Sequence, residues 1–286
     1  MSTQSTPRKK YSFEFFPPRS AETEEKLLHT RQRLAVLQPE FFSVTFGAGG
    51  STRDKTLETV LALRDATGIE AVPHLSCIGY GLNDLKNVIS TYRQHGLRHI
   101  VALRGDIPSG AIGSGPLKFA NELVELIRLE TGDYFHIDVA CYPEFHPQAV
   151  SARKDMENFK RKVDAGANGA ITQYFYNPDA YFRFLDDCER AGIDIPVFPG
   201  IMPILNREQL LRFSRLCGAE IPLWILKRLE DFADDMDAIQ AFGIEVVTEL
   251  CSILLSRGAP GLHIYTMNRH AASEAIWANL GLGNNH

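Results

Sequence analysis

Short apolar runs rich in β-branched and aromatic residues recur eight times along the chain, and stretches with helical apolar spacing separate them. A strand that is buried on both faces has a continuous apolar sequence of this kind. Regular alternation of strands with helices is typical of a parallel sheet. The pattern therefore predicts eight parallel strands. The runs are Tyr11–Phe16, Phe41–Phe46, Glu70–Cys77, His99–Gly105, His136–Pro143, Gly169–Phe175, Ile195–Ile201 and Gly261–Met267.

The stretches between the runs predict helices that pack on this sheet. Leu85, Val88, Ile89 and Tyr92 follow the i, i+3, i+4, i+7 spacing of one helical face. Right-handed crossovers place such helices on one side, and a closed barrel leaves no exposed edge strand. We therefore expect a single (β/α)8 barrel of the TIM type, with an open doubly wound sheet as the alternative.

The interval between the seventh and eighth runs is longer than one helix needs. It contains three segments with helical apolar spacing, Arg207–Leu216, Leu223–Asp234 and Ala238–Ser256, so we expect extra helices there. The Gly- and Ser-rich segment Ser109–Pro116 predicts a flexible loop beside the end of the fourth strand.

Composition fits one globular domain of 286 residues, with 44% hydrophobic and 23% charged residues. We expect a barrel domain over residues 11–282, with flexible tails at 1–10 and 283–286. A net charge of -5 argues against a nucleic-acid-binding surface. The five cysteines form no C-x-x-C pair, and the sequence lacks a signal peptide and an apolar run of about 18 residues, so we expect a cytoplasmic protein without membrane contact.

Polar residues stand at the C-terminal ends of the predicted strands. The C-terminal ends of a parallel barrel meet at one mouth, where residues distant in sequence surround a single pocket. These residues therefore predict one site: Glu14, Thr45, His74, Arg104, Asp106, Tyr142, Gln173 and Tyr265.

Glu14 is the first candidate for chemistry because it lies among aromatic residues and prolines at a strand end. Apolar surroundings disfavour the charged form of a carboxylate, which suits a general acid at neutral pH. The alternative is a structural ion pair with Arg19 or another cation at the mouth.

Two further groups carry charge near the predicted mouth. Arg104-Gly105-Asp106 places a cation and a carboxylate after the fourth strand, either as part of a site or as a self-contained turn. Asp155, Asn158 and Lys162 share one helical face, which either meets water or, with His146 and Arg161, binds the pyrophosphate and ribose of an anionic dinucleotide.

Several well-known sites are missing from the sequence. The segment Gly47–Ser51 lacks the third glycine of a dinucleotide fingerprint, and we find no P-loop, no H-E-x-x-H and no G-x-S-x-G. His74, His146 and His263 lie on separate segments without metal-ligand spacing, so no metal is expected.

Seven ordered fragments together resemble the methylenetetrahydrofolate reductase family, in its short bacterial type. The resemblance extends from Tyr11 to about Leu280. Its fragments are Phe13–Arg19, Ser43–Ala48, Pro73–Leu75, His99–Asp106, Tyr142–Pro147, Lys160–Ala167 and Ile171–Phe175.

The resemblance implies an enzyme that reduces 5,10-methylenetetrahydrofolate to 5-methyltetrahydrofolate. NADH or NADPH would donate hydride to bound FAD, and folate would then receive it at the same flavin face, supplying methyl groups for methionine synthesis. By the same resemblance, Glu14 is the acid that protonates N10 of the folate, and Asp106 favours the resulting cation and adjusts the flavin.

The resemblance also assigns binding residues and a homo-oligomer, with a tetramer as the common form. It does not choose between NADH and NADPH. Gln173 and Phe213 are expected to bind substrate, as are Glu14, Asp106, Gln209, Tyr265 and Arg269. The expected FAD contacts are Thr45, His74, Arg104, Gly105, Asp106, Phe119, Ala120, Ala140, Tyr142, His146, Asp155, Asn158, Arg161 and Lys162.

Two other readings stay open from the residues alone. One is a flavin-free barrel lyase or isomerase in which Glu14 and His74 form an acid–base pair. The other is a non-catalytic folate- or nucleotide-binding module, since a fold does not guarantee an activity.

Overall fold

The structure, a computed structural model, describes residues 8–46, 50–106 and 115–283, and for residues 50–54 the backbone alone. Its strands form one parallel sheet in the order β7-β6-β5-β4-β3-β2-β1-β9-β8. The strands are β1 (Lys10–Phe15), β2 (Phe41–Val44), β3 (Glu70–Ser76), β4 (His99–Leu103), β5 (His136–Cys141), β6 (Gly169–Thr172), β7 (Val197–Phe198), β8 (Gly200–Ile201) and β9 (Gly261–Tyr265).

The sheet curls into a barrel because β7 and β8 behave as one strand interrupted at Pro199. β7 pairs with β6, whereas β8 pairs with β9. Proline has no N–H to donate, but its carbonyl accepts a hydrogen bond from the His263 backbone at 3.0 Å. The predicted (β/α)8 barrel is confirmed, and the seventh predicted run is the place where the ring closes.

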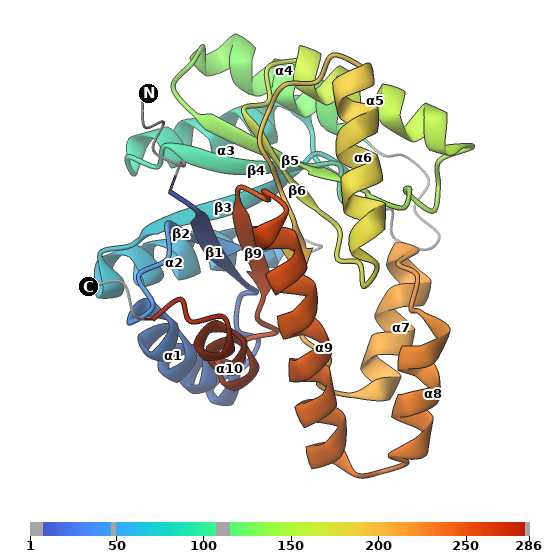
Figure 1. Cartoon of the computed structure of the whole chain (residues 1–286). Coiled ribbons are helices and arrows are strands. Elements are labelled where there is room, and N and C mark those ends of the chain that lie inside the picture. Colours follow the sequence, from blue (N-terminus) through green and yellow to red (C-terminus); the bar gives the residue numbers. More distant parts are fainter. Residues whose placement is uncertain (1–7, 47–49, 107–114, 284–286) are drawn as a thin grey trace, which may run out of the picture.

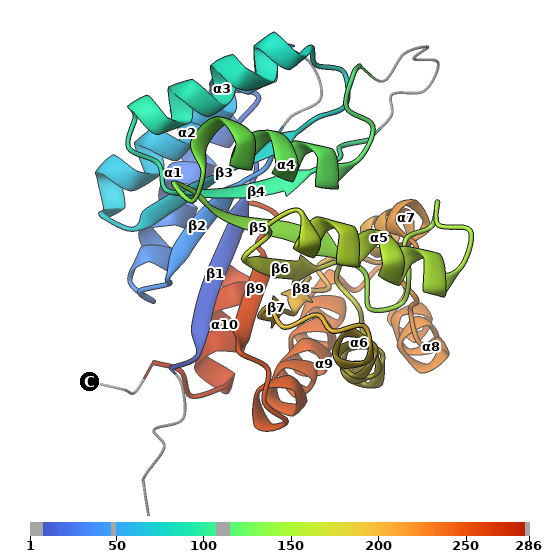
Figure 2. The same cartoon turned by 90° about the horizontal axis from the view of Figure 1, so that it is seen from above.

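Helices surround the strands, as Figure 1 and the view from above in Figure 2 show. Gly68 and Gly96 end α2 and α3 with φ values of 69° and 72°, in the left-handed region that glycine adopts without strain. The helices are α1 (Ala21–Ala35), α2 (Gly50–Thr67), α3 (Leu82–Gln94), α4 (Ala120–Thr131), α5 (Ala152–Asp164), α6 (Pro178–Arg190), α7 (Arg207–Cys217), α8 (Leu223–Asp231), α9 (Met236–Ser256) and α10 (Ala271–Asn279).

The extra helices predicted before the last strand are α7, α8 and α9. In both views α7 and α8 lie to one side of the barrel. An ion pair between Arg207 and Glu230, 2.9 Å apart, links these two helices. The interval is therefore longer than a minimal barrel requires because α7 and α8 extend the wall beside the mouth.

The two faces of the strands bury different residues. The outward face packs on the helices through residues such as Phe13, Phe15 and Ile137, which are fully buried. The inward face combines an apolar cluster of Val72, Val101 and Ile171 with polar side chains. By strand register, the buried polar residues on the inward face are Ser12, Ser43, His74, His99, Asp138 and His263.

Several predicted boundaries need correction. The strand runs extend past the observed strands, because buried loop residues such as Phe175 prolong the apolar pattern beyond the last ladder hydrogen bonds. Phe119, an expected FAD contact, is the N-cap of α4 and is 55% exposed. The segments 109–114 and 47–49 lie outside the described residues, as do 1–7 and 284–286 of the predicted tails.

Contrary to expectation, α9 is long and apolar enough to cross a membrane by length and composition alone. In the fold, however, one of its faces is buried through Ile239, Val247, Leu250 and Leu254. Burial in a helical layer accounts for its hydropathy without a bilayer.

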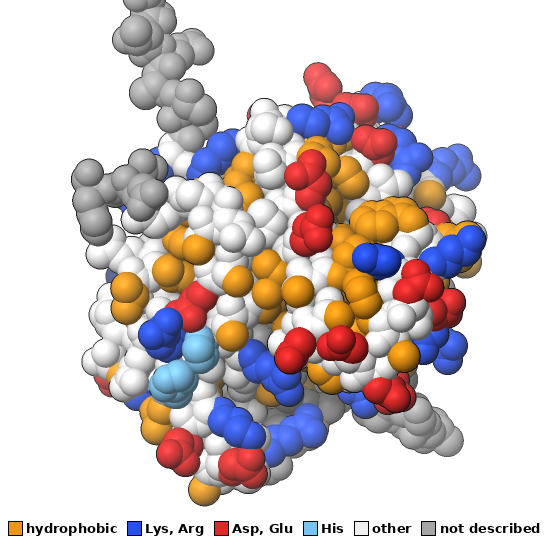
Figure 3. Space-filling model, turned by 60° about the horizontal axis from the view of Figure 1, so that its bottom comes forward, with side chains coloured by type: hydrophobic (Ala, Val, Ile, Leu, Met, Phe, Trp, Pro, Cys, Tyr) orange, Lys and Arg blue, Asp and Glu red, His pale blue; other side chains and the backbone are white. Residues whose placement is uncertain are grey.

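The surface view in Figure 3 shows acidic and basic side chains interspersed over one face, with small groups of hydrophobic residues between them. On that face, basic side chains do not gather into one continuous area.

Candidate active site

A cleft of about 980 Å³ opens at the C-terminal ends of β2, β3, β4 and β5. This is the end at which barrel enzymes carry their sites. All the predicted FAD contacts except His74 line the cleft: Thr45, Arg104, Gly105, Asp106, Phe119, Ala120, Ala140, Tyr142, His146, Asp155, Asn158, Arg161 and Lys162.

One wall of the cleft is the polar face of α5. Ser151 caps the helix, its hydroxyl accepting a hydrogen bond from the Lys154 N–H at 3.2 Å. The Asp155 carboxylate, in the first turn, accepts one from the His146 N–H at 2.8 Å. This bond joins the loop after β5 to the helix, so both segments present their polar groups to the same cleft.

Lys162 extends from the last turn of α5 to β5. Its ammonium donates a hydrogen bond to the Ala140 carbonyl. Burial lowers the pKa of Lys162, while nearby Asp155 opposes that shift. Because this ammonium donates only to a neutral carbonyl among the described residues, it is a suitable partner for an anionic ligand.

Tyr142 and His146 meet at the same wall with their rings edge to face, 4.6 Å between centroids. Burial raises the pKa of the Tyr142 hydroxyl above its ordinary value, so the hydroxyl stays neutral. Burial and Arg104 together lower the pKa of His146.

The Arg104-Gly105-Asp106 segment forms the floor beside β4. Gly105 has φ 87°, and a β-carbon there would lie 3.0 Å from that of Ser76, so the close packing of these two loops requires glycine. Neither Arg104 nor Asp106 forms a salt bridge with another residue in the described part of the chain. Within the segment, Nε of Arg104 donates a hydrogen bond to the Gly105 carbonyl at 3.2 Å, and both charged side chains line the cleft.

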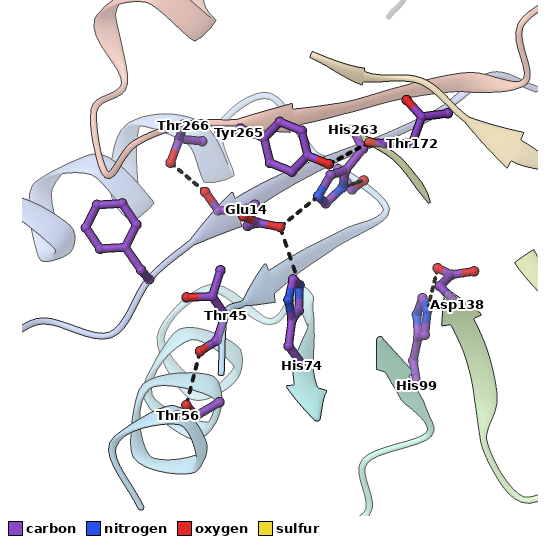
Figure 4. A network of polar contacts seen from close by, with 12 residues as sticks. Glu14, Thr45, Thr56, His74, His99, Asp138, Thr172, His263, Tyr265 and Thr266 are labelled. Carbon is purple, nitrogen blue, oxygen red and sulfur yellow. Dashed lines mark hydrogen bonds and ion pairs between the residues drawn. The ribbon is translucent and has the colours of Figure 1, made fainter. Parts of the chain in front are cut away.

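Glu14 occupies the inner face of β1, where Figure 4 shows it between two histidines. Its Oε2 lies 3.4 Å from Nε2 of His74 and 3.4 Å from Nε2 of His263. Ser12 fixes the second ring through a 2.7 Å contact with Nδ1 of His263. The imidazoles take the place of the alternative partner Arg19, whose side chain lines the cleft.

His74 lies behind the cleft wall instead of in it. It is buried and stands two residues before Ser76, which lines the cleft. Burial lowers the pKa of His74 to about 4, although Glu14 opposes the shift. At neutral pH this imidazole is uncharged, so it orients Glu14 by polar contact without supplying a positive charge.

The remaining predicted substrate residues lie outside this cleft. Tyr265 faces inward from β9 and donates a 2.7 Å hydrogen bond to the Thr172 carbonyl at the end of β6. Gln173 follows β6 directly, and Arg269 follows β9. Gln209 and Phe213 are half-buried one turn apart on α7.

Sequence reasoning missed some members of the site. His263 was considered only as a metal ligand, although its alternation with Tyr265 on one strand indicates that it faces inward. Arg19, Tyr80 and Asp84 also line the cleft and were not predicted to do so. They come from loops and a helix start, where no strand-end pattern marks them.

A barrel whose mouth combines an inward carboxylate held by imidazoles with a long polar cleft belongs to the class of TIM-barrel enzymes that act on small molecules. The model of the methylenetetrahydrofolate reductase family matches residues 2–281. The chain therefore belongs to the methylenetetrahydrofolate reductase family.

Individual relatives agree with this assignment. The 5,10-methylenetetrahydrofolate reductase of Escherichia coli (strain K12) is 44% identical over 271 residues, covering 95% of this chain and 90% of that protein. Methylenetetrahydrofolate reductase (NADH) 1 of Arabidopsis thaliana is 39% identical over 285 residues, covering 95% of this chain and 48% of that longer protein.

A solved structure shares the fold. It is an uncharacterized protein from Clostridium thermocellum that binds two copies of 5-methyl-5,6,7,8-tetrahydrofolic acid. The two chains superpose with a TM-score of 0.66 at 17% identity, over 97% of this chain and 95% of that one.

Proposed function

We propose that this protein reduces 5,10-methylenetetrahydrofolate to 5-methyltetrahydrofolate with NADH or NADPH as hydride donor, in two half-reactions that share a bound FAD. Family membership supports the folate reaction, and the cleft supports the choice of cofactor. We place the reaction in residues 11–282 of a cytoplasmic homo-oligomer, where it supplies methyl groups for methionine synthesis.

The residues of the cleft fit an anionic dinucleotide. The volume of about 980 Å³ is in the upper part of the range for small-molecule and cofactor sites. Arg161 and Lys162 would hold the pyrophosphate, and the Asp155 and Asn158 side chains the polar groups beside it. Arg104, Thr45 and Tyr142 would hold the ring system at the barrel end. A flavin bound there would accept hydride in one half-reaction and donate it in the other.

Glu14 is proposed as the general acid. A proton held on its carboxyl group would pass to N10 of the folate, opening the five-membered ring and leaving a cation on the carbon to be reduced. The two imidazoles at 3.4 Å fix the position of the carboxyl group, and its 18% exposure leaves one side open to substrate. Proton transfer requires such positioning within hydrogen-bond reach.

Asp106 is proposed to stabilise the cation formed on the folate. Its carboxylate has no salt-bridge partner among the described residues, so its charge is available to a ligand in the cleft. An uncompensated negative charge placed where positive charge develops lowers the barrier to ring opening. Gln173, Gln209, Phe213, Tyr265 and Arg269 would complete the folate and nicotinamide contacts from the β6, β9 and α7 side.

The observation that carries the proposal is the convergence of Arg104, Asp155, Arg161 and Lys162 on one cleft beside the Glu14 network. An absorption spectrum of the purified protein, recorded before and after anaerobic addition of NADH, is the direct test. Flavin bands that bleach with NADH and return with methylenetetrahydrofolate are the expected result. Rates with NADH and NADPH then establish the preferred donor.

The contact between Glu14 and His74 also favours one alternative, a flavin-free acid–base reaction in the barrel. The same spectrum distinguishes the two. A colourless protein that takes up no FAD on reconstitution contradicts the flavin-dependent function.

A further inference from the structure

A second polar cluster lies at the opposite end of the barrel from the cleft. His99 and His136 are the first residues of β4 and β5 and are register partners, and Asp138 follows two residues later on β5. Residues two apart on a strand share a face, so the three side chains converge at the amino-terminal ends of adjacent strands. Figure 4 shows His99 and Asp138 apart from the Glu14 network.

The donor atoms of the cluster are close together. Nε2 of His99 lies 2.8 Å from Oδ2 of Asp138, and Nε2 of His136 lies 3.3 Å from Oδ1. One donor atom from each residue falls within 4.8 Å of the others. Four ligands at about 2.0–2.2 Å from a tetrahedral metal are separated by roughly 3.4 Å, so small side-chain rotations would bring these three into coordination.

The carboxylate of the cluster is buried. Asp138 is 2% exposed, and within the described ranges its carboxylate contacts only the two imidazoles, with no lysine or arginine. A buried carboxylate without a lysine or arginine partner depends on the groups around it to compensate its charge. A divalent cation bound by all three groups would compensate that charge directly.

The surroundings leave room for the carboxylate and a route for an ion. Gly169, on β6, faces Asp138 so closely that any β-carbon there would clash with its Oδ1. His136 is 49% exposed, so solvent reaches one side of the cluster, whereas His99 is buried with its ring against Phe41, 4.8 Å between centroids. The site is built on strands, shielded on one side and open on the other.

We propose that His99, His136 and Asp138 form a divalent metal site of the zinc class, separate from the catalytic cleft. Two imidazoles and one carboxylate suit zinc, which is usually tetrahedral, and disfavour Mg²⁺ and Ca²⁺, which prefer oxygen ligands. Water would complete the coordination on the exposed side. The metal would join β4 and β5 at the amino-terminal end of the barrel. In this fold that end contributes to stability, whereas the carboxyl-terminal end carries the active site.

Zn²⁺ binding tests the proposal: the unaltered protein is treated with a chelator and then titrated with Zn²⁺ in a calorimeter. We expect one equivalent per chain and a melting temperature that rises with Zn²⁺, because a ligand that binds the folded state stabilises it. Failure of the unaltered protein to bind one equivalent of Zn²⁺ overturns the proposal.

Substitutions assign the site. Loss of a partner that only orients a ligand typically costs about 10–100-fold in affinity, so His136→Gln should weaken Zn²⁺ binding at least tenfold. The matched control is His95→Gln, which removes an exposed imidazole that contacts the Thr91 carbonyl at 2.9 Å within its own helix turn, and this variant should bind Zn²⁺ as the unaltered protein does. Equal affinity in both variants contradicts the assignment.

X-ray absorption of the Zn²⁺-loaded, unaltered protein keeps the proposal testable if His136→Gln fails to fold. The expected spectrum shows nitrogen and oxygen neighbours with the scattering of two imidazoles. A sulfur neighbour, or fewer than two imidazoles, places the metal elsewhere and overturns the proposal.

Discussion

Glu14 shares one carboxylate oxygen between two imidazoles, with His74 and His263 each 3.4 Å away. Residue type and position at a strand end suffice to select Glu14 from the sequence, but its partners come from β3 and β9, far away in the chain. The His74 imidazole, which is uncharged at neutral pH because burial lowers its pKa, orients the carboxyl group without imposing the charge that an arginine would impose. That difference suits a residue that must carry a proton.

Glu14→Gln removes the acidic proton while preserving shape. We expect methylenetetrahydrofolate reduction to fall by about 10²–10⁴-fold, the usual contribution of a general acid, with flavin reduction by NADH retained. Stopped-flow spectroscopy of the two half-reactions measures both rates. The control is Glu70→Gln, at the exposed amino-terminal end of β3, which should change neither rate. An equal loss in both half-reactions of Glu14→Gln removes Glu14 from the acid role.

His74 makes the free energy of unfolding depend on pH in the acid range. Because burial lowers its pKa from 6.5 to about 4, the unfolded chain binds more protons than the folded one between these values. Its contribution to stability is therefore intact above pH 6.5 and declines as the pH falls toward 4, by at most about 1.4 kcal/mol per pH unit. Urea unfolding at several pH values should show a shallower acid slope in His74→Asn. Identical slopes contradict this origin.

At the scale of elements, α5 shows what a local pattern can establish. The polar residues Asp155, Asn158 and Lys162 share one face of this helix, and Phe159 is buried on the other. The direction of the polar face depends on the helix docking beside β5. The Asp155 bond to the His146 backbone secures that docking.

Ser151→Ala tests how far this element depends on its cap. Loss of the Ser151 hydroxyl bond to the Lys154 N–H should lower the free energy of unfolding by about 1 kcal/mol. Denaturant unfolding measures the change. Ser90→Ala, at an exposed position inside α3, is the control and should be neutral or slightly stabilising because alanine favours helix interiors. An unchanged midpoint for Ser151→Ala shows that the cap does not stabilise the fold.

Other elements illustrate where local patterns fail. Strand ends were predicted too late because buried loop residues such as Tyr174 and Phe175 have the same composition as strand residues. Phe119 stands four residues before the buried Leu123 of α4, yet it is the exposed N-cap of that helix beside the cleft. Apolar residues alone therefore do not distinguish a strand or helix from a loop or a cap. Tertiary contacts decide which of these the residue belongs to and whether it is buried.

At the scale of the whole molecule, closure of the barrel depends on the approach of β6, β8 and β9 at Gly200. A β-carbon at this position would clash with the Thr172 carbonyl and lie 2.7 Å from the Tyr265 ring. Only glycine lets the three strands meet there. The same contact holds the Tyr265 hydroxyl on the Thr172 carbonyl.

Gly200→Ala should therefore destabilise the protein by about 1–3 kcal/mol or more, since overpacking forces strands apart. Thermal or denaturant unfolding measures the loss. A β-carbon at Gly283 meets open space, so Gly283→Ala should leave the stability unchanged. A stable Gly200→Ala protein with intact structure contradicts the closure argument.

The sequence by itself determined the alternation of strands and helices, the extra helices before the last strand, and the residue types at the mouth. These follow from period and composition, which are local properties of the chain. Only the tertiary structure decided that Pro199 divides the closing strand, that imidazoles and not Arg19 hold Glu14, and that His99, His136 and Asp138 converge. Each of these depends on strand register, because a shift of one residue reverses which side chains face inward.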